Sequence, residues 1–212
     1  MKRRIARDLL KIKAVFLRPE EPFTWASGIK SPIYCDNRLT LSDVAVRDDV
    51  EQALAKIVRR HYPECEMVMG TSTAGIAHAA LVADILEIPM GYVRSNVKDH
   101  GRNNQIEGRC EPGTKVVVIE DLISTAGSAV DVAEALRAAG AEVLGIASIF
   151  SYGMKAGEER LRDHGLKNVS ATNYDVLLDV ACSEGYLRKR SIPALKAFRD
   201  NPSDESWIKN LK

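Results

Sequence analysis

The sequence lacks the features that mark several large classes of protein: a long apolar run, an excess of charge of one sign, and closely spaced cysteines. No apolar stretch approaches the ~20 residues that a membrane-spanning helix needs. The formal net charge is only +1, so no global field attracts a polyanion such as duplex DNA. The four cysteines form no CxxC pair, which argues against a disulfide framework and a structural zinc site. We therefore expect a cytoplasmic protein with reduced thiols and with neither a membrane nor a nucleic-acid partner.

Familiar motifs for nucleotide binding and covalent catalysis are also missing. Residues 70–75 have the glycine spacing of a P-loop, but Ile76 and Ala77 stand where a Lys and a Ser or Thr are required. No GxGxxG follows an expected strand, and neither a nucleophile elbow nor a cluster of metal ligands is present. The 70–75 loop still follows a strand and opens a helix, so a phosphate can rest on its amides.

The composition, with 45% hydrophobic and 28% charged residues, is typical of one soluble domain with a substantial core. Apolar spacing predicts two helices before residue 64, and then an alternation of strands and helices. The first helix runs through Ile5, Leu9, Ile12 and Phe16 and stops before Pro19. Ser42 precedes the second, which ends near 61–63. Strands are expected at 67–69, 90–93, 115–121 and 143–150, and helices at 74–86 and 128–139.

This alternation predicts parallel strands joined by right-handed crossovers. Residues 116–119 are apolar at every position, as expected of a central strand that is covered on both faces. We therefore predict one α/β domain over residues 1–212, a doubly wound and mostly parallel sheet. The Pro-, Gly- and Ser-rich segment 19–40 is expected to form part of a small N-terminal hood over it.

Ligands of open α/β sheets bind beyond the carboxyl ends of the strands, so the loop after residues 116–119 is the first candidate site. It reads Glu120, Asp121, Leu122, Ile123, Ser124, Thr125, Ala126, Gly127 and Ser128. Small hydroxyl residues and a glycine at a helix N-terminus suit a phosphate, and the two acids suit sugar hydroxyls or a divalent cation. The run alone leaves an alternative open, in which the hydroxyls only cap the helix and the acids lie in solvent.

A second candidate is the long polar segment at about 94–111, which we call the lid segment. Loops of this length inside a compact domain are usually functional or disordered. Its cationic residues, which suit an anionic ligand, are Arg94, Lys98, His100, Arg102 and Arg109. The alternative is a solvated hairpin whose charges pair with Asp99, Glu107 and Glu111.

Taken together, the motifs resemble a known family. The run Val116 to Ser128 resembles the signature with which type I phosphoribosyltransferases bind 5-phosphoribosyl 1-diphosphate. Two further stretches, Phe23 to Tyr34 and Lys98 to Gly101 followed by Asn104 to Gly108, are similar to the orotate phosphoribosyltransferases in particular. The similarity extends over essentially the whole chain. It implies transfer of the phosphoribosyl group to orotate, giving orotidine 5'-monophosphate and pyrophosphate in pyrimidine biosynthesis, with Mg²⁺.

The resemblance also implies a role for each matching residue. Glu120 and Asp121 accept the ribose hydroxyls, residues 124–128 hold the 5-phosphate, and Ser124 also lies close to orotate, with no direct metal ligand assigned. Arg94, Lys98 and His100 reach the diphosphate from the neighbouring subunit, which implies a homodimer with shared sites. The residues expected to be catalytic are Lys98, His100 and Asp121.

Several positions depart from the family pattern. Ala26 and Ala74 stand where many relatives have a lysine, and Ser95 stands where a second basic residue is common. Tyr152 occupies a place where an arginine often meets the orotate carboxylate, and Ala126 stands where glycine is usual.

Two other functions compete with the preferred one. A purine base phosphoribosyltransferase is disfavoured by residues 23–34 and by the lid segment. A regulator that keeps the fold and binds the diphosphate as an effector is expected to carry a DNA-binding module or a basic face, and the near-zero net charge gives no sign of one.

Overall fold

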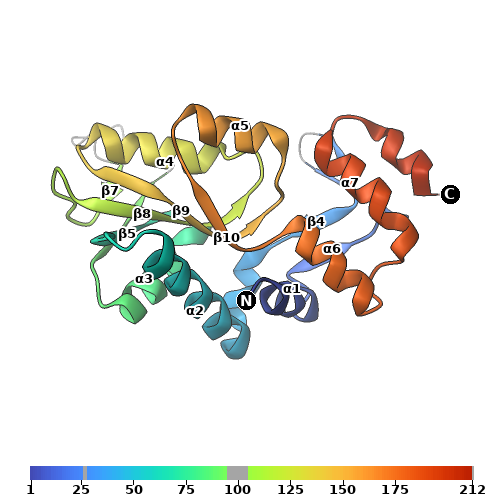
Figure 1. Ribbon diagram of the computed structural model, residues 1–212, viewed down its shortest axis with the longest axis horizontal. Coiled ribbons are helices and arrows are strands. Elements are labelled where there is room, and N and C mark those ends of the chain that lie inside the picture. The colour runs from blue at the N-terminus through green and yellow to red at the C-terminus, as the bar shows by residue number, and fades with distance from the viewer. Residues whose placement is uncertain (26–27, 95–104, 212) are drawn as a thin grey trace.

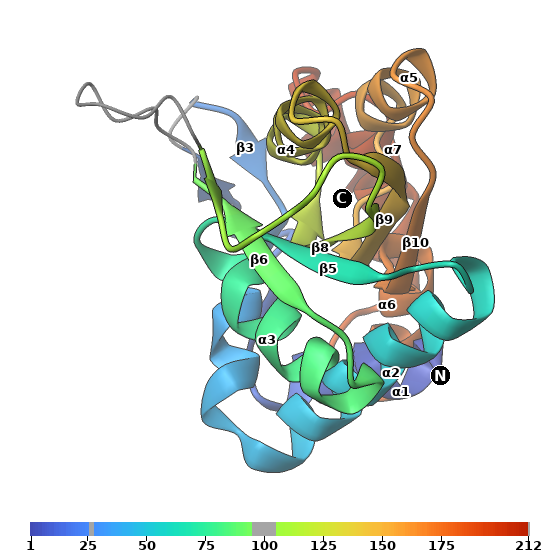
Figure 2. The ribbon, with the colours of Figure 1, turned by 90° about the vertical axis from the view of Figure 1, so that its left-hand side faces the viewer.

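The computed structural model describes residues 1–25, 28–94 and 105–211, and a six-stranded sheet forms the centre of this part of the chain (Figures 1 and 2). The strand order is β10-β9-β8-β5-β6-β7. The first five strands are parallel, and β7 pairs antiparallel with β6. The strands are β5 (Met67–Thr71), β6 (Met90–Val93), β7 (Ile106–Glu107), β8 (Lys115–Ile123), β9 (Glu142–Ser151) and β10 (Asn168–Asn173). The expected α/β class and mostly parallel sheet are confirmed.

Helices cover both faces of the sheet, as Figure 1 shows. Helices α4 (Gly127–Ala138) and α5 (Lys155–Asp163) lie on one face, and α1 (Lys2–Lys11), α2 (Val44–His61) and α3 (Ala74–Leu86) lie on the other. The central strand β8 sends alternate side chains into the two cores: Val116 and Val118 pack into one, and Val117 and Ile119 into the other. Burial on both faces explains why this stretch is apolar at every position.

The chain before residue 44 differs from the sequence prediction at two points. Helix α1 ends at Lys11, and Lys13 adopts a left-handed φ of 58° that cannot continue a helix. Phe16 therefore belongs to β1 (Val15–Leu17), which pairs antiparallel with β4 (Ile33–Cys35). Helix α2 is capped by Asp43, whose carboxylate accepts from the Val46 N–H at 3.1 Å, and Ser42 lies before it in η1 (Asn37–Ser42).

Strands β2, β3 and β4 lie in the segment 19–40 that was expected to form part of a hood, and they belong to two small sheets, β1-β4 and β2-β3. Strands β2 (Phe23–Thr24) and β3 (Lys30–Ser31) pair antiparallel. Trp25, which follows β2, makes edge contacts with Tyr152 and Phe198, with ring centroids 6.3 and 5.7 Å apart. These contacts join the hood to the end of β9 and to the C-terminal helices.

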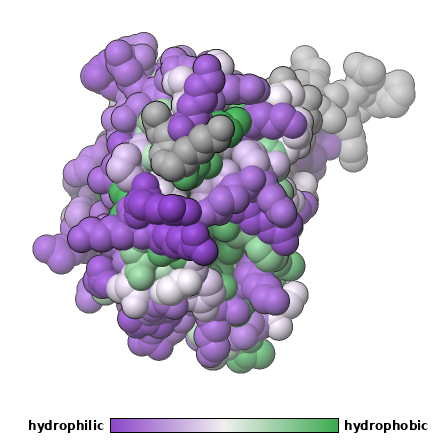
Figure 3. All heavy atoms as spheres, turned by 90° about the vertical axis from the view of Figure 1, so that its right-hand side faces the viewer, coloured by the Kyte–Doolittle hydropathy of each residue, from purple (hydrophilic) through white to green (hydrophobic). Residues whose placement is uncertain are grey.

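The C-terminal third was not predicted, apart from β9. It consists of α5, β10, α6 (Tyr174–Ser183), η2 (Lys189–Ser191), α7 (Ile192–Asp200) and η3 (Glu205–Leu211). Trp207 and Phe198 are fully buried and pack edge to face at 5.7 Å, which anchors η3 on α7. The face of the molecule that carries these helices is mostly hydrophilic, with small apolar areas between the charged side chains (Figure 3). Within the ranges that the structure describes, no helix has the length and apolar character of a membrane span.

The other sequence-predicted elements are confirmed within a few residues. Helix α3 and strand β6 have the expected bounds, α4 begins and ends one residue early, and β5, β8 and β9 run longer than expected. The lid segment was predicted too long, because residues 106–107 form β7. Strand β7 pairs with β6, and next to this pairing the Arg94 N–H donates to the Gln105 carbonyl at 2.9 Å. Lys98, His100, Ser95 and Arg102, like Ala26, lie outside the described residues.

Candidate functional site

Three of the sequence-predicted loops meet at the carboxyl ends of β5, β6 and β8. A pocket of about 230 Å³ lies between them and the first turns of α4. It is lined by Thr71, Ser72, Val93, Arg94, Gln105, Ser128, Asp131 and Val132. The 70–75 loop, the start of the lid segment and the end of the acid-hydroxyl run therefore border one cavity, as the rule for open parallel sheets predicts.

Glu120 lies near the carboxyl end of β8 and is almost fully buried, with 6% of its surface exposed. One carboxyl oxygen accepts from the Thr71 hydroxyl at 2.7 Å and from the Asp121 N–H at 3.0 Å. Burial, together with the neighbouring Asp121 carboxylate, raises the pKa of the Glu120 carboxyl to about 8. At neutral pH Glu120 is therefore mostly protonated.

Asp121 is half-buried at the same edge, and the hood holds its backbone in place. The Asn37 amide donates to the Asp121 carbonyl at 2.7 Å, and the Asn37 side-chain oxygen accepts from the Cys35 thiol at 3.3 Å. Asn37 is only 1% exposed. Sequence reasoning placed Asn37 in the hood without a role, because no pattern reveals a partner 84 residues away.

Leu122 and Ile123 complete β8 rather than lying in a loop. They pair with Phe150 and Ser151 of β9, and the Ile123 carbonyl accepts from the Tyr152 N–H at 2.9 Å. These bonds fix the direction in which the chain enters the turn that follows.

Residues 124–128, which we call the phosphate turn, lead into α4. The N-cap of α4 is Ala126, and no side chain caps the helix. The Ser124, Thr125 and Ser128 hydroxyls have no hydrogen-bond partner within the described ranges, so the alternative in which they only cap the helix is wrong. Ala126 adopts a φ of 60°, a conformation that glycine takes more easily, and its methyl group is buried. The turn thus leaves hydroxyls and the first helical N–H groups available to an anion.

Helix α5 packs directly against the back of the phosphate turn. A Cβ on Gly157 would lie 2.2 Å from the Ser124 carbonyl oxygen, so only glycine allows this approach. One turn further along α5, a guanidinium nitrogen of Arg160 lies 3.0 Å from the position that a Cβ on Gly127 would take. Sequence reasoning missed this contact because it identified no element after residue 150.

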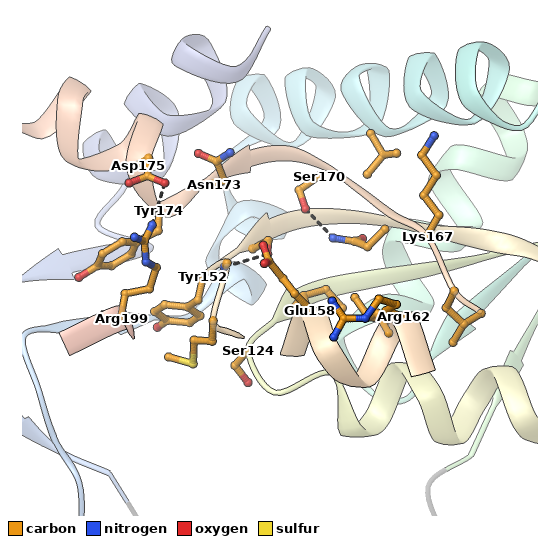
Figure 4. A pocket seen from close by; sticks show the side chains of 18 of the residues that line it. Ser124, Tyr152, Glu158, Arg162, Lys167, Ser170, Asn173, Tyr174, Asp175 and Arg199 are labelled. Atoms are coloured by element: carbon orange, nitrogen blue, oxygen red, sulfur yellow. Dashed lines mark hydrogen bonds and ion pairs between the residues drawn. The ribbon is translucent and has the colours of Figure 1, made fainter. Parts of the chain in front are cut away.

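A larger cavity of about 690 Å³ lies on the other side of the phosphate turn, between α5 and β10 (Figure 4). It extends from Ser124 and Tyr152 to Lys167 and Ser170, and Arg162 also lines it. Asp121, the one expected catalytic residue that lies within the described ranges, does not line it.

Tyr152 contributes an aromatic ring where the family pattern has a cation. It is 3% exposed and packs on Phe150 and Tyr174, with centroids 5.3 and 5.9 Å away. Burial raises the pKa of its hydroxyl well above the usual value. Ala74, another described position that departs from the family pattern, is the first residue of α3.

The described residues contain no group of three or more His, Cys, Asp or Glu side chains that could hold a metal ion. Asp121 is partly exposed at the carboxyl end of β8 and has the hard oxygen donors that Mg²⁺ prefers. Mg²⁺ is commonly bound by one or two carboxylates together with substrate phosphates, and this donor set fits that mode.

Comparisons with known proteins agree on the family. Residues 41–182 match the model of the phosphoribosyl transferase domain. The chain is 53% identical to the orotate phosphoribosyltransferase of Bacillus anthracis over 208 residues, 98% of this chain and 99% of the relative. It is 54% identical to that of Bacillus subtilis (strain 168), over 99% and 97% of the two chains. The crystal structure of orotate phosphoribosyltransferase from Aeropyrum pernix matches with a TM-score of 0.75 and 31% identity, covering 86% of this chain and 99% of that one.

Proposed function

Because the chain belongs to the orotate phosphoribosyltransferases, within the phosphoribosyl transferase family, we propose that it transfers the phosphoribosyl group of 5-phosphoribosyl 1-diphosphate to orotate. The products are orotidine 5'-monophosphate and pyrophosphate, in pyrimidine biosynthesis. One observation carries the assignment. The carboxyl groups of Glu120 and Asp121 and the unpaired hydroxyls of the phosphate turn lie together at the carboxyl end of β8, and Ser128 of that turn lines the 230 Å³ pocket. This arrangement suits a sugar phosphate, with hydroxyl acceptors at one end and anion donors at the other.

The chemistry requires positioning more than covalent participation. Breaking the bond at C1 builds positive charge on the ribose ring and negative charge on the departing diphosphate. Groups that stabilise the leaving group and orient the ring therefore supply most of the rate enhancement. No nucleophilic side chain is needed.

Each residue has a role in this scheme. Glu120 and Asp121 accept the ribose hydroxyls, and the Asp121 carboxylate also faces the charge that develops on the ring. Leu122 and Ile123 hold the chain that leads into Ser124, Thr125, Ala126, Gly127 and Ser128, which bind the 5-phosphate. Ser124 is also proposed to contact orotate. Arg94, Lys98 and His100 act on the diphosphate bound at the site of the neighbouring subunit.

Magnesium is the proposed cofactor. When bound with the diphosphate it would neutralise part of the charge of the leaving group. Asp121 is the side chain that fits it, whereas the buried Glu120 oxygen is already held by Thr71.

We propose that the lid segment covers the site of the partner subunit in a homodimer. If Lys98 and His100 act in trans, Lys98→Ala and Asp121→Asn chains are each inactive alone, but a mixed dimer has one intact site. Random mixing makes about half of the dimers hybrid, so about a quarter of the wild-type activity should return on refolding the two together. Hybrids that are detected by mass spectrometry and yet are no more active than either parent would rule out the shared site.

An assay of pyrophosphate release tests the function itself. We expect release that depends on orotate and falls when Mg²⁺ is removed, with little release when hypoxanthine or xanthine replaces orotate. Release with a purine base instead would indicate the purine enzyme. Binding of 5-phosphoribosyl 1-diphosphate without turnover of any base would indicate the regulator.

A further inference from the structure

The Arg160 side chain lies against the phosphate turn at the start of α4. It projects from the last turn of α5, and one guanidinium nitrogen reaches the first residue of α4, Gly127. Within the described residues no carboxylate lies at ion-pair distance from Arg160, and the side chain is exposed. Although no ion pair holds the Arg160 side chain, it lies against the N-terminus of α4 instead of pointing into water.

That place is electrostatically unfavourable in the absence of a ligand. The N-terminus of a helix carries about half a positive charge, and a cation beside it destabilises the helix by roughly 0.3–1 kcal/mol. An anion bound at the same helix end would turn this unfavourable interaction into a favourable one.

The phosphate turn itself contains no positively charged side chain. Residues 120–128 contain two acids and no basic residue, so the turn provides only neutral amides and hydroxyls. A phosphate monoester carries between one and two negative charges near neutral pH. Binding it strongly needs a cation close to the turn.

Gly157 explains how α5 comes near enough to supply one. Because it has no side chain, the helix backbone lies directly on the Ser124 carbonyl. Arg160, three residues later, then lies on the same face of α5.

We propose that Arg160 is a further binding residue for the 5-phosphate of the substrate, providing from α5 the positive charge that the phosphate turn lacks. This inference rests on the proposed function, because it takes the turn as the 5-phosphate site. It concerns one end of the substrate only, since the diphosphate lies at the other end.

Equilibrium binding of two fragments separates the ends. Ribose 5-phosphate carries the 5-phosphate alone, and inorganic pyrophosphate mimics the leaving group. We expect Arg160→Gln to weaken the binding of ribose 5-phosphate about tenfold, to leave pyrophosphate binding unchanged, and to reduce the dependence of ribose 5-phosphate binding on salt. Arg160→Lys should restore part of the affinity.

Arg162→Gln is the matched control. Arg162 lies in the same last turn of α5, so the two substitutions remove the same charge from the same helix end, but Arg162 lines the 690 Å³ cavity instead (Figure 4). The control should bind ribose 5-phosphate like the wild type. Equal losses in the two variants, or a loss for pyrophosphate as large as that for ribose 5-phosphate, would overturn the proposal. Wild-type protein that binds both fragments but makes no orotidine 5'-monophosphate would instead count against the proposed function.

Discussion

The two ends of the candidate site are built in different ways. At the ribose end, side chains do the positioning: Thr71 holds Glu120, and Asn37 reaches from the hood to hold the backbone of Asp121. At the phosphate end, backbone is packed on backbone: Gly157 lies on the Ser124 carbonyl, and Ala126 makes the turn at a φ of 60°. The ribose end should therefore respond most to the loss of a charged or hydrogen-bonding group, whereas the phosphate end should tolerate no added bulk.

The largest effect is expected from Gly157→Ala, which tests the phosphate end. The added methyl group would meet the Ser124 carbonyl at 2.2 Å, so the turn or the helix must move by about 1 Å. A displacement of that size can lower the rate about 100-fold. Steady-state kinetics should show this loss in kcat/KM, while Ala156→Ser, on the exposed side of α5, should behave like the wild type. A fully active Gly157→Ala variant would show that the close approach is unimportant.

Asp121→Asn should have the next largest effect, at the ribose end. The amide keeps the size of the side chain but loses the charged acceptor, and a hydrogen bond to a charged group contributes about 2 kcal/mol, which is about 30-fold in affinity. Calorimetry should show this weakening for 5-phosphoribosyl 1-diphosphate, with an unchanged unfolding midpoint. Unchanged binding would contradict the assignment of Asp121.

Asn37→Ala tests whether the hood positions the ribose end. Losing the bond to the Asp121 carbonyl should raise the KM for 5-phosphoribosyl 1-diphosphate about fivefold, because a neutral hydrogen bond contributes about 1 kcal/mol. Leu39→Ala, in the same 3₁₀ helix but 42% exposed, is the control. If only the unfolding midpoint falls and KM is unchanged, Asn37 has a structural role alone.

A separate effect, on stability instead of on activity, comes from Glu120. Its pKa is about 8 in the folded protein against an ordinary 4.5, so between these values the folded state holds a proton that the unfolded state has lost. Stability from this group is thus present at low pH and is lost as the pH rises from about 4.5 to about 8. Glu120→Gln mimics the neutral form. Because the wild type loses about 3–4 kcal/mol from this group between pH 5 and pH 8, the unfolding midpoint of the variant should gain about 10 °C on the wild type over that range. A difference that does not change with pH would show that Glu120 is ionised in both states.

The sequence predicted the central sheet and the acid-hydroxyl run because both depend on local patterns. The apolar residues 116–119 predict a strand that is covered on both faces, and a run of small hydroxyl residues before a helix predicts an anion-binding site. The contacts that the sequence did not predict join residues that are far apart in the chain. Asn37 meets Asp121 across 84 residues, and Gly157 is recognisable as a site residue only once α5 lies on Ser124.

The buried state of Glu120 also required the structure. From the sequence, two adjacent acids at a strand end look equivalent. In the fold, one is covered and protonated and the other is partly exposed, because successive residues of a strand point to opposite faces.

The most direct test of the two-ended site is to compare the binding of ribose 5-phosphate with that of 2-deoxyribose 5-phosphate. The wild type should bind 2-deoxyribose 5-phosphate about tenfold more weakly than ribose 5-phosphate, because the 2-hydroxyl is missing. In Asp121→Asn this ratio should fall to about one, whereas Arg160→Gln should weaken both ligands and keep the ratio. A ratio that is the same in the wild type and in Asp121→Asn would contradict the placement of the ribose at the end of β8.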